Sequence, residues 1–233
     1  MNQNLKNKKI FCIIPAFNEE KKIAQTIKSV IPFVNKVIII NDASIDQTKN
    51  ILDQLQKKFP LQITILNHLT NCGQGASLAT GNTYAQSQNA DIIIHFDADG
   101  QHRTCDIAPL IKPILNDEAD IVFGSRFQEL KSKMPFFKKN IIMPIARCIN
   151  KIFFDINLTD PQSGMRAMNK KALTEIKINQ SGMAHCTEII YASHKKNLKI
   201  KEVPIQVIYH EFGQGLKGGL RIIKDFILGS LVR

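Results

Sequence analysis

The sequence predicts an α/β fold with a mostly parallel central sheet and helices on both of its faces. Short apolar runs alternate with amphipathic stretches over the first half of the chain. This alternation is typical of right-handed βαβ units, in which a helix returns the chain to the start of the next parallel strand. The apolar runs are continuous in Ile and Val, which indicates strands that are covered on both faces.

The elements follow one another in a regular order in this half of the chain. The apolar runs predict strands at residues 9–15, 36–42, 61–66, 91–97 and 120–126. The stretches between them predict helices at residues 19–31, 46–58, 75–88 and 105–115.

The pattern is looser in the second half. Residues 128–140 are basic and contain a proline, so we expect a loop, and residues 141–154 predict an apolar helix. Residues 198–210 predict a late strand pair or a long edge strand, because Pro204 cannot donate a ladder hydrogen bond. Residues 216–233 predict an amphipathic helix, with its Leu and Ile residues on one face.

The charge balance narrows the choice of partners. The chain of 233 residues carries a net charge of +11, which favours nucleic acid, an anionic membrane surface or phosphate-bearing small molecules. It has no zinc-finger spacing, no aromatic RNA-binding signature and no basic heptad region, so we do not expect nucleic acid to be a partner. Composition and charge do not predict the oligomeric state.

Cysteine usage and hydropathy indicate the compartment. The five cysteines are scattered and include no C-x-x-C pair, which indicates free thiols in a reducing environment. No stretch approaches the roughly 20 apolar residues of a membrane-spanning helix. We therefore expect a cytoplasmic protein, either free or bound peripherally to the cytoplasmic face of the membrane.

Acidic side chains follow three of the predicted strands. Asp97 and Asp99 lie one residue apart after the fourth strand, so on an extended chain their carboxylates point the same way. Two like charges aimed at one place disfavour each other's ionisation unless a cation lies between them. Together with Gln101 they offer only oxygen ligands, which suits Mg²⁺ or Mn²⁺. Carboxylates simply solvated at a strand end are the alternative.

Two common phosphate-binding motifs do not explain these strand ends. The G-x-x-x-x-G-K-[ST] loop is absent, and the glycines of "GQG" follow the third strand, whereas a dinucleotide-binding motif would place them after the first. A divalent ion that in turn faces a diphosphate accounts for the acids better.

Six segments in the same order carry a family resemblance. They are "IIPAFNEEKKIAQTI", "VIIINDASIDQT", "NCGQGASLATG", "DADGQH", "DIVFGSR" and "DPQSGMRAMNKKAL". In this order the chain resembles the family 2 glycosyltransferases, and within them the dolichyl-phosphate mannosyltransferase type, which act on polyprenyl phosphates. The resemblance implies a single GT-A domain over residues 1–233, with a Rossmann-like nucleotide-sugar-binding half at 8–126 and an acceptor-side half at 127–233. It also implies inversion at the sugar carbon.

The resemblance assigns donor-side roles. Pro15, Phe17 and Glu19 match the turn that receives the nucleoside, and Asp42 matches the acid that holds the base or ribose. Gly75 lies in the glycine motif on the donor side. Asp97, Asp99 and Gln101 match the D-x-D-x-Q element that binds the metal ion and the diphosphate of a UDP- or GDP-sugar.

The resemblance also assigns an acceptor side. Arg126 matches the arginine that meets the acceptor phosphate, and Asp160 and Ser163 belong to the D-x-x-S-G turn near it. Met165 stands where many members have Phe, which we expect to be a packing change. His102 is given no catalytic role.

Structural readings stay open at several positions. Acids in a first helical turn interact favourably with the helix dipole, so Glu19 could simply start a helix. Asp46 could be an N-cap, and Glu188 could be a capping acid or a sugar contact. Gly75 and the glycines around it could serve only tight turns and close packing.

The acceptor decides what else the chemistry requires. A sugar hydroxyl needs a general base, for which Asp160 is the nearest candidate. A lipid phosphate is already ionised and needs a positive clamp, which Arg126 and the basic segment 131–139 would provide. The sequence favours the lipid phosphate, with a saccharide hydroxyl, a sugar nucleotidyltransferase and a non-catalytic binding protein as alternatives.

Overall fold

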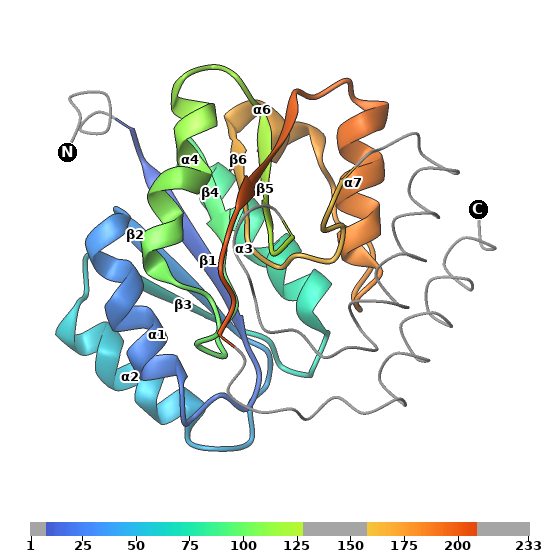
Figure 1. Cartoon of the computed structure of the whole chain (residues 1–233). Helices are drawn as coiled ribbons and strands as arrows, with labels where there is room; N and C mark the ends of the chain where they lie inside the picture. Colours follow the sequence, from blue (N-terminus) through green and yellow to red (C-terminus); the bar gives the residue numbers. More distant parts are fainter. Residues whose placement is uncertain (1–7, 128–157, 209–233) are drawn as a thin grey trace.

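One twisted sheet organises the described part of the chain, residues 8–127 and 158–208, in this computed structural model (Figure 1). Its strand order is β3-β2-β1-β4-β6-β5-β7, and only β6 runs antiparallel to its neighbours. The strands are β1 (Ile10–Ala16), β2 (Lys36–Asn41), β3 (Ile63–Asn67), β4 (Ile92–His95), β5 (Ile121–Ser125), β6 (Arg166–Asn169) and β7 (Ile200–Pro204).

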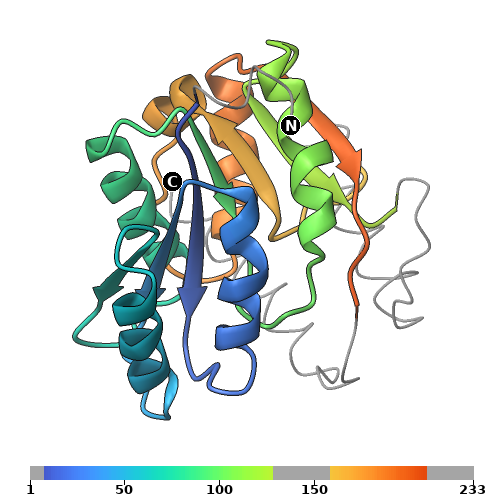
Figure 2. The same ribbon diagram turned by 90° about the vertical axis from the view of Figure 1, so that its left-hand side faces the viewer.

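Helices cover both faces of this sheet, as the sequence predicts (Figures 1 and 2). The α-helices are α1 (Ile23–Val30), α2 (Thr48–Lys58), α3 (Gln74–Ser87), α4 (Ile107–Leu115), α6 (Lys170–Glu175) and α7 (His185–Lys195), with short 3₁₀ turns η2 (Ile31–Phe33) and η3 (Thr104–Asp106). Helices α1, α2 and α4 pack on one face, and α3, α6 and α7 pack on the other.

Alternation along the strands divides the core into two layers. In β1, Cys12 and Ile14 face the α1 side, whereas Phe11 and Ile13 face the α3 side. Successive side chains of a strand point to opposite faces, so a continuous apolar run supplies both layers. This explains why Ile and Val fill the runs without interruption.

The first predicted helix is shorter than the sequence predicts. It begins at Ile23 instead of residue 19, and residues 19–22 form a turn. The amide of Glu19 donates to Thr48 Oγ1, and the amide of Glu20 donates to Asp46 Oδ2. These bonds join the turn after β1 to the loop after β2, so the two strand ends are fixed to each other. Asp46 Oδ1 also accepts from the amide of Thr48, but the N-cap residue of α2 is Gln47, so Asp46 lies one residue before the cap position.

The sequence predictions include neither β6 nor the helices α6 and α7. Strand β6 has only four residues and starts with Arg166, so it lacks the apolar run that marks the other strands. It inserts between β4 and β5, where the neighbouring strands impose the extended conformation.

The late strand is shorter than the expected range of 198–210. Strand β7 lies at one edge of the described sheet and ends at Pro204, in agreement with an edge position. Val207 then makes an isolated bridge with His102. The predicted loop at 128–140 and the predicted helices at 141–154 and 216–233 lie outside the described residues.

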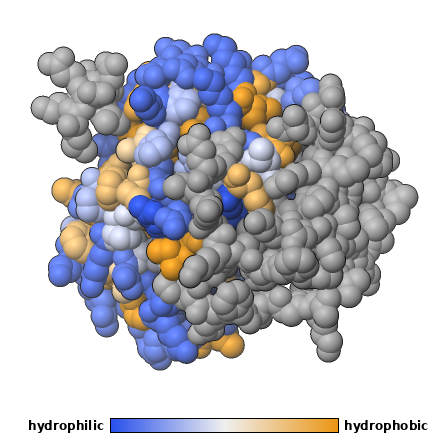
Figure 3. Space-filling model, in the orientation of Figure 1, coloured by the Kyte–Doolittle hydropathy of each residue, from blue (hydrophilic) through white to orange (hydrophobic). Residues whose placement is uncertain are grey.

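On the face seen in Figure 3 the described surface is mainly hydrophilic, with apolar side chains in separate small groups. Among the helices within residues 8–127 and 158–208, none is both long and apolar enough to cross a bilayer.

Helix α3 approaches the sheet closely at Gly81. A Cβ atom at this position would lie 2.4 Å from Ile13 Cγ2 and 2.9 Å from Ile40 Cδ1. Both isoleucines are fully buried, so neither can move away at low cost. Gly81 is therefore required by packing.

We predict that Gly81→Ala lowers the free energy of unfolding by about 1–3 kcal/mol, the usual cost of overpacking a core. Urea denaturation would measure the change. Gly182→Ala is the control, because a Cβ atom there has no neighbour within 4 Å. Equal stability of the two variants would contradict the packing role of Gly81.

Candidate active site

The carboxyl ends of the parallel strands meet along one edge of the sheet, which is the lower edge in Figure 2. Ligands of open α/β sheets bind at this edge. The turn after β1, the loop after β2 and the loop after β4 all reach it. The amide of Asp42 donates to Ala16 O at 2.9 Å, which joins the first two of these segments directly.

Asp97 is held from three directions. Gln74 Nε2 at the start of α3 donates to its Oδ1 at 2.9 Å, and His102 Nε2 lies 3.0 Å from its Oδ2. From the third side Gly164 packs so closely that a Cβ atom there would lie 2.3 Å from Asp97 Oδ2. The carboxylate is 28% exposed, so it is positioned but still reachable.

Asp97 is also kept ionised. Burial alone would raise its pKa, but the hydrogen bond with His102 and the charge of Arg166 hold the pKa of Asp97 below its ordinary value. A fixed, ionised carboxylate suits either a cation or the hydroxyl groups of a donor.

The carboxylate of Glu19 lies close enough to three other acids for their charges to act on it. Burial raises the pKa of the half-buried Glu19, and the nearby charges of Asp99, Asp46 and Asp97 raise it further. Such an excess of negative charge is relieved by a bound cation. Asp99 Oδ1 accepts from the amide of Gln101, which folds the predicted metal-binding residues into one loop.

The residues present fit Mg²⁺ or Mn²⁺. The side chains that gather here offer carboxylate and amide oxygens, which hard divalent ions prefer. Asp97, Asp99 and Gln101 stay the predicted metal ligands, and Glu19 faces the same place.

Asp42 organises the loop that leads into α3. It is buried, and its Oδ1 accepts from the amide of Cys72 at 2.9 Å and lies 2.7 Å from His68 Nδ1. Its Oδ2 accepts from the amide of Gly73 at 2.8 Å. Contact of Asp42 with a base or ribose stays a prediction, and the structure adds this second role.

Gly75 has a structural reason to be glycine. Its amide donates to Ser181 O at 2.8 Å, and a Cβ atom on Gly75 would lie 1.9 Å from Gln180 O. Ser181 and Gln180 belong to the loop between α6 and α7. Glu188 on α7 holds this loop, because its Oε2 accepts from the amides of Asn179 and Gln180. Close packing of two loops therefore accounts for Gly75, and its contact with a donor stays a prediction.

The turn after β1 presents an aromatic ring at the edge of the site. Phe17 is 45% exposed, and Pro15 is half-buried at the end of the strand. The following Asn18 has φ 55°, a left-handed conformation that Asn tolerates better than most residues. An exposed ring at this position is available to a nucleobase.

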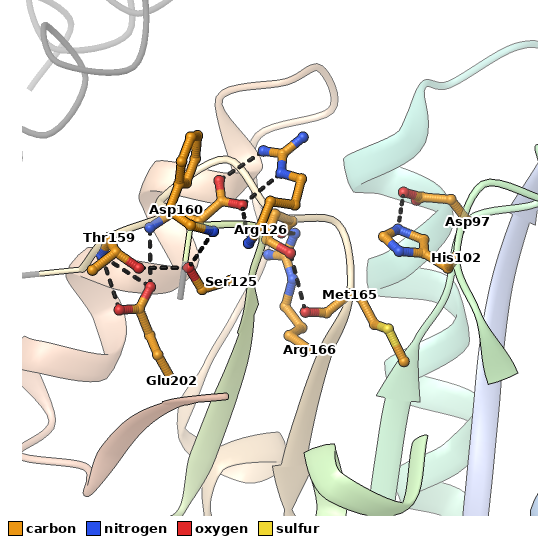
Figure 4. Close-up of polar contacts among 11 residues, drawn as sticks. Asp97, His102, Ser125, Arg126, Thr159, Asp160, Met165, Arg166 and Glu202 are labelled. Carbon is orange, nitrogen blue, oxygen red and sulfur yellow. Dashed lines mark hydrogen bonds and ion pairs between the residues drawn. The ribbon is translucent and has the colours of Figure 1, made fainter. Parts of the chain in front are cut away.

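Arg126 and Asp160 form a buried pair on the other side of β6 (Figure 4). Arg126 Nη2 donates to Asp160 Oδ1 at 2.7 Å, and Arg126 Nε donates to Oδ2 at 2.5 Å. Asp160 is fully buried and also accepts from the amide of Arg126. Two parallel bonds of this kind fix the plane of the guanidinium.

Glu202 on β7 supports this pair, a role that the sequence analysis did not predict. Its carboxylate accepts from the amides of Thr159 and Asp160 at 2.8–3.0 Å, and Thr159 Oγ1 bonds to Ser125 Oγ (Figure 4). The turn that carries Asp160 is thus fixed by an edge strand 42 residues further along the chain. Such a contact between distant residues has no local sequence signal.

Ser163 and Met165 contribute to packing. Ser163 is buried, and its hydroxyl donates to Met165 O at 3.4 Å, so phosphate binding by Ser163 stays a prediction. Met165 is fully buried in the α1-side core, which confirms that the side chain at this position packs.

A buried polar group lies behind the D-x-x-S-G turn. Arg166 is 1% exposed, and its Nη2 donates to Ser163 O at 2.9 Å and to Cys186 Sγ at 3.4 Å. Burial would raise the pKa of Cys186, but His185 and Arg166 together lower it to about 6. The sulfur of Cys186 is therefore a hydrogen-bond acceptor that helps to hold the buried Arg166 in the core.

Comparison with known proteins agrees with this geometry. Residues 11–177 match the model of the family described as Glycosyl transferase family 2. A UDP-N-acetylglucosamine–dolichyl-phosphate N-acetylglucosaminyltransferase of Methanococcus voltae is 34% identical over 88% of this chain and 88% of its own length. An undecaprenyl-phosphate mannosyltransferase of Micrococcus luteus is 26% identical over 91% of this chain and 89% of its own length.

Solved structures show the same fold. Glucosyl-3-phosphoglycerate synthase from Mycobacterium tuberculosis, in complex with Mn²⁺, UDP and glucosyl-3-phosphoglycerate, superposes with a TM-score of 0.74 over 98% of this chain and 81% of that chain. Its sequence identity is 16%, so the likeness shows the fold, which is of the GT-A type. The family match and the relative above 30% identity lead to one conclusion: this chain is a glycosyltransferase that belongs to family 2.

Proposed function

We propose that this glycosyltransferase moves a sugar from a UDP- or GDP-sugar to a polyprenyl phosphate, with inversion at the sugar carbon. The names of two relatives support a polyprenyl-type phosphate as the acceptor. The observation that carries the proposal is the oriented guanidinium of Arg126 at the carboxyl end of β5. This is the same edge of the sheet as the acid cluster, by which we mean Glu19, Asp46, Asp97 and Asp99.

A short turn, residues 160–164, links Arg126 to the acids around Asp97. Asp160 at its start binds Arg126, and Gly164 at its end packs against Asp97. Four residue steps span at most about 14 Å of extended chain. A positive group for an anionic acceptor is therefore close to the acids that would hold the metal ion and the diphosphate.

The donor side would work by binding and charge neutralisation. Phe17 and Asp42 would receive the nucleoside, and Asp97, Asp99 and Gln101 would hold Mg²⁺ or Mn²⁺. When bound, this ion supplies the positive charge that a departing nucleoside diphosphate requires. Asp97, fixed by Gln74, His102 and Gly164, would keep the donor in one position.

The acceptor side would work by placing an anion that is already a nucleophile. A phosphate monoester is ionised near neutral pH, so no general base is needed, and the planar guanidinium of Arg126 would orient it. Both oxygens of Asp160 accept from Arg126, which favours a role for Asp160 in holding Arg126 over a role as the base for a sugar hydroxyl. A saccharide acceptor is therefore the second candidate.

The acceptor implies a place of action. A polyprenyl phosphate resides in a membrane, and the net charge of +11 would favour contact with its anionic surface. We propose that the protein acts peripherally at the cytoplasmic face.

We predict that Asp99→Asn and Gln101→Ala each abolish metal-dependent transfer, because each removes a ligand oxygen or its charge. Asp117→Asn is the matched control, because Asp117 is exposed in a loop after α4. Transfer of radiolabelled sugar to polyprenyl phosphate would be measured with Mg²⁺ and with Mn²⁺. Parental activity in either site variant, at equal thermal stability, would remove that residue from the metal site.

We predict that Arg126→Gln lowers both stability and transfer, whereas the double variant Arg126→Gln/Asp160→Asn regains stability only. The single variant leaves the carboxylate of Asp160 buried and unpaired, which costs about 3–5 kcal/mol. The double variant removes that charge but still lacks the guanidinium. Thermal melting and transfer assays would be run on the same samples. Recovery of transfer in the double variant would show that Arg126 is only structural.

We predict that Gly164→Ala raises the dissociation constant for the nucleoside diphosphate plus Mn²⁺ by about tenfold or more, because residues that position a metal-binding side chain affect affinity on this scale. The added methyl group would push Asp97 out of its bonds with Gln74 and His102. Titration calorimetry would measure the constant, with Gly182→Ala as the control. Equal affinity in the two variants would show that the position of Asp97 does not control donor binding.

A further inference from the structure

A second group of metal-ligating side chains lies at the ends of β2 and β3. Asp42, His68 and Cys72 each offer one ligand atom, and these atoms all lie within 4.8 Å of one another. They are a carboxylate oxygen, an imidazole nitrogen and a thiol sulfur. In this respect the group differs from the all-oxygen set of Asp97, Asp99 and Gln101.

The arrangement needs little movement to hold an ion. Donors that share a tetrahedral Zn²⁺ at 2.0–2.3 Å are about 3.3–3.7 Å apart. Asp42 Oδ1 and His68 Nδ1 are at 2.7 Å, so they need to separate slightly. Cys72 is an exposed free cysteine, so its side chain can turn toward them without disturbing the core.

The surrounding contacts hold the group in place. The amide of His68 donates to Asn41 O, and the amides of Cys72 and Gly73 donate to the carboxylate of Asp42. The second ring nitrogen of His68 lies 2.9 Å from Thr80 Oγ1 on α3. A hydrogen bond on the nitrogen that does not bind the metal is the usual support of a histidine ligand.

We propose that Asp42, His68 and Cys72 form a site for a soft divalent ion of the Zn²⁺ class, with water in the remaining position. Thiolate and imidazole ligands select such ions against Mg²⁺. The two sites therefore sort ions by ligand type, with the hard ion at the end of β4 and the soft ion at the ends of β2 and β3. Binding releases protons, because the thiol and the imidazole must be deprotonated.

The location of this site predicts that a bound ion affects nucleotide binding. This step rests on the proposed function, in which Asp42 receives the nucleoside. An ion on the carboxylate of Asp42 would occupy that part of the pocket, so Zn²⁺ would weaken binding of the nucleoside diphosphate. The site would then act as an inhibitory site for soft metals, separate from the metal site that supports transfer.

The first experiment tests the ion site without any substrate. Co²⁺ is added to the purified full chain, and the thiolate-to-cobalt charge-transfer band in the near ultraviolet is recorded. We expect a saturable band that Zn²⁺ removes stoichiometrically and Mg²⁺ does not. Cobalt at the acid cluster produces no such band, because no thiolate is among its proposed ligands.

Matched variants identify the residues that bind the cobalt ion responsible for this band. Cys72→Ser and His68→Gln should each remove it, whereas Cys105→Ser and His194→Gln should keep it, because Cys105 is also an exposed free cysteine and His194 is exposed on α7. Thr80→Val leaves all three ligands in place and should weaken Zn²⁺ binding by about 10–100-fold. A parental band in Cys72→Ser, or no band in the parent protein, would overturn the proposal.

The second experiment tests the consequence. The affinity for UDP and for GDP is measured at constant Mg²⁺ with and without Zn²⁺, in the parent and in Cys72→Ser. We expect Zn²⁺ to weaken nucleotide binding at least tenfold in the parent and to leave the affinity of Cys72→Ser unchanged. Equal effects in the two proteins would overturn the inhibitory role. Failure of both nucleotides to bind even without Zn²⁺ would instead count against the proposed function, and the cobalt band would still decide the ion site.

Discussion

The contact between Gly164 and the carboxylate of Asp97 is the constraint on which the rest of the site depends. A Cβ atom cannot be accommodated at this point, since it would lie 2.3 Å from Asp97 Oδ2. The turn that includes Gly164 therefore reaches the loop after β4 with its backbone alone. Through this contact one short turn joins Asp97 to the buried Arg126–Asp160 pair.

The two parts of the site differ in how their charged side chains are arranged. Around Asp97, like charges lie close together, and burial and the neighbouring acids raise the pKa of Glu19. At Arg126 and Asp160, opposite charges are joined in a buried pair with two hydrogen bonds. The first arrangement leaves a demand for a cation, whereas the second fixes a cationic side chain in one orientation. A reaction between a metal-bound diphosphate and an anionic acceptor requires both.

The sequence predicted the five strands β1 to β5 because each is a continuous apolar run, and it placed acids at the carboxyl ends of β1, β2 and β4, where the structure has them. It missed β6, since a four-residue strand that begins with a buried arginine has no such run. It also missed Gln74 and Glu202 as supports of the site. Gln74 bonds to an acid 23 residues away and Glu202 to a turn 42 residues away, and the sheet order that brings them together has no local signal.

Glu202 shows how the edge of the sheet contributes to the site. Strand β7 pairs only with β5 among the described strands. The carboxylate of Glu202 on this strand nevertheless accepts from the amides of Thr159 and Asp160. Asp160 in turn fixes the guanidinium of Arg126, which is at the end of β5. Strand β7 pairs with β5 from Ile200 to Pro204. This pairing determines the position of Glu202 along the sheet, and so its position relative to the turn that carries Asp160. A shift of this register by one residue would turn Glu202 to the other face of the sheet and leave the turn without its acceptor. The orientation of the proposed phosphate clamp is therefore determined by backbone pairing at the edge of the sheet, as well as by the residues of the site itself.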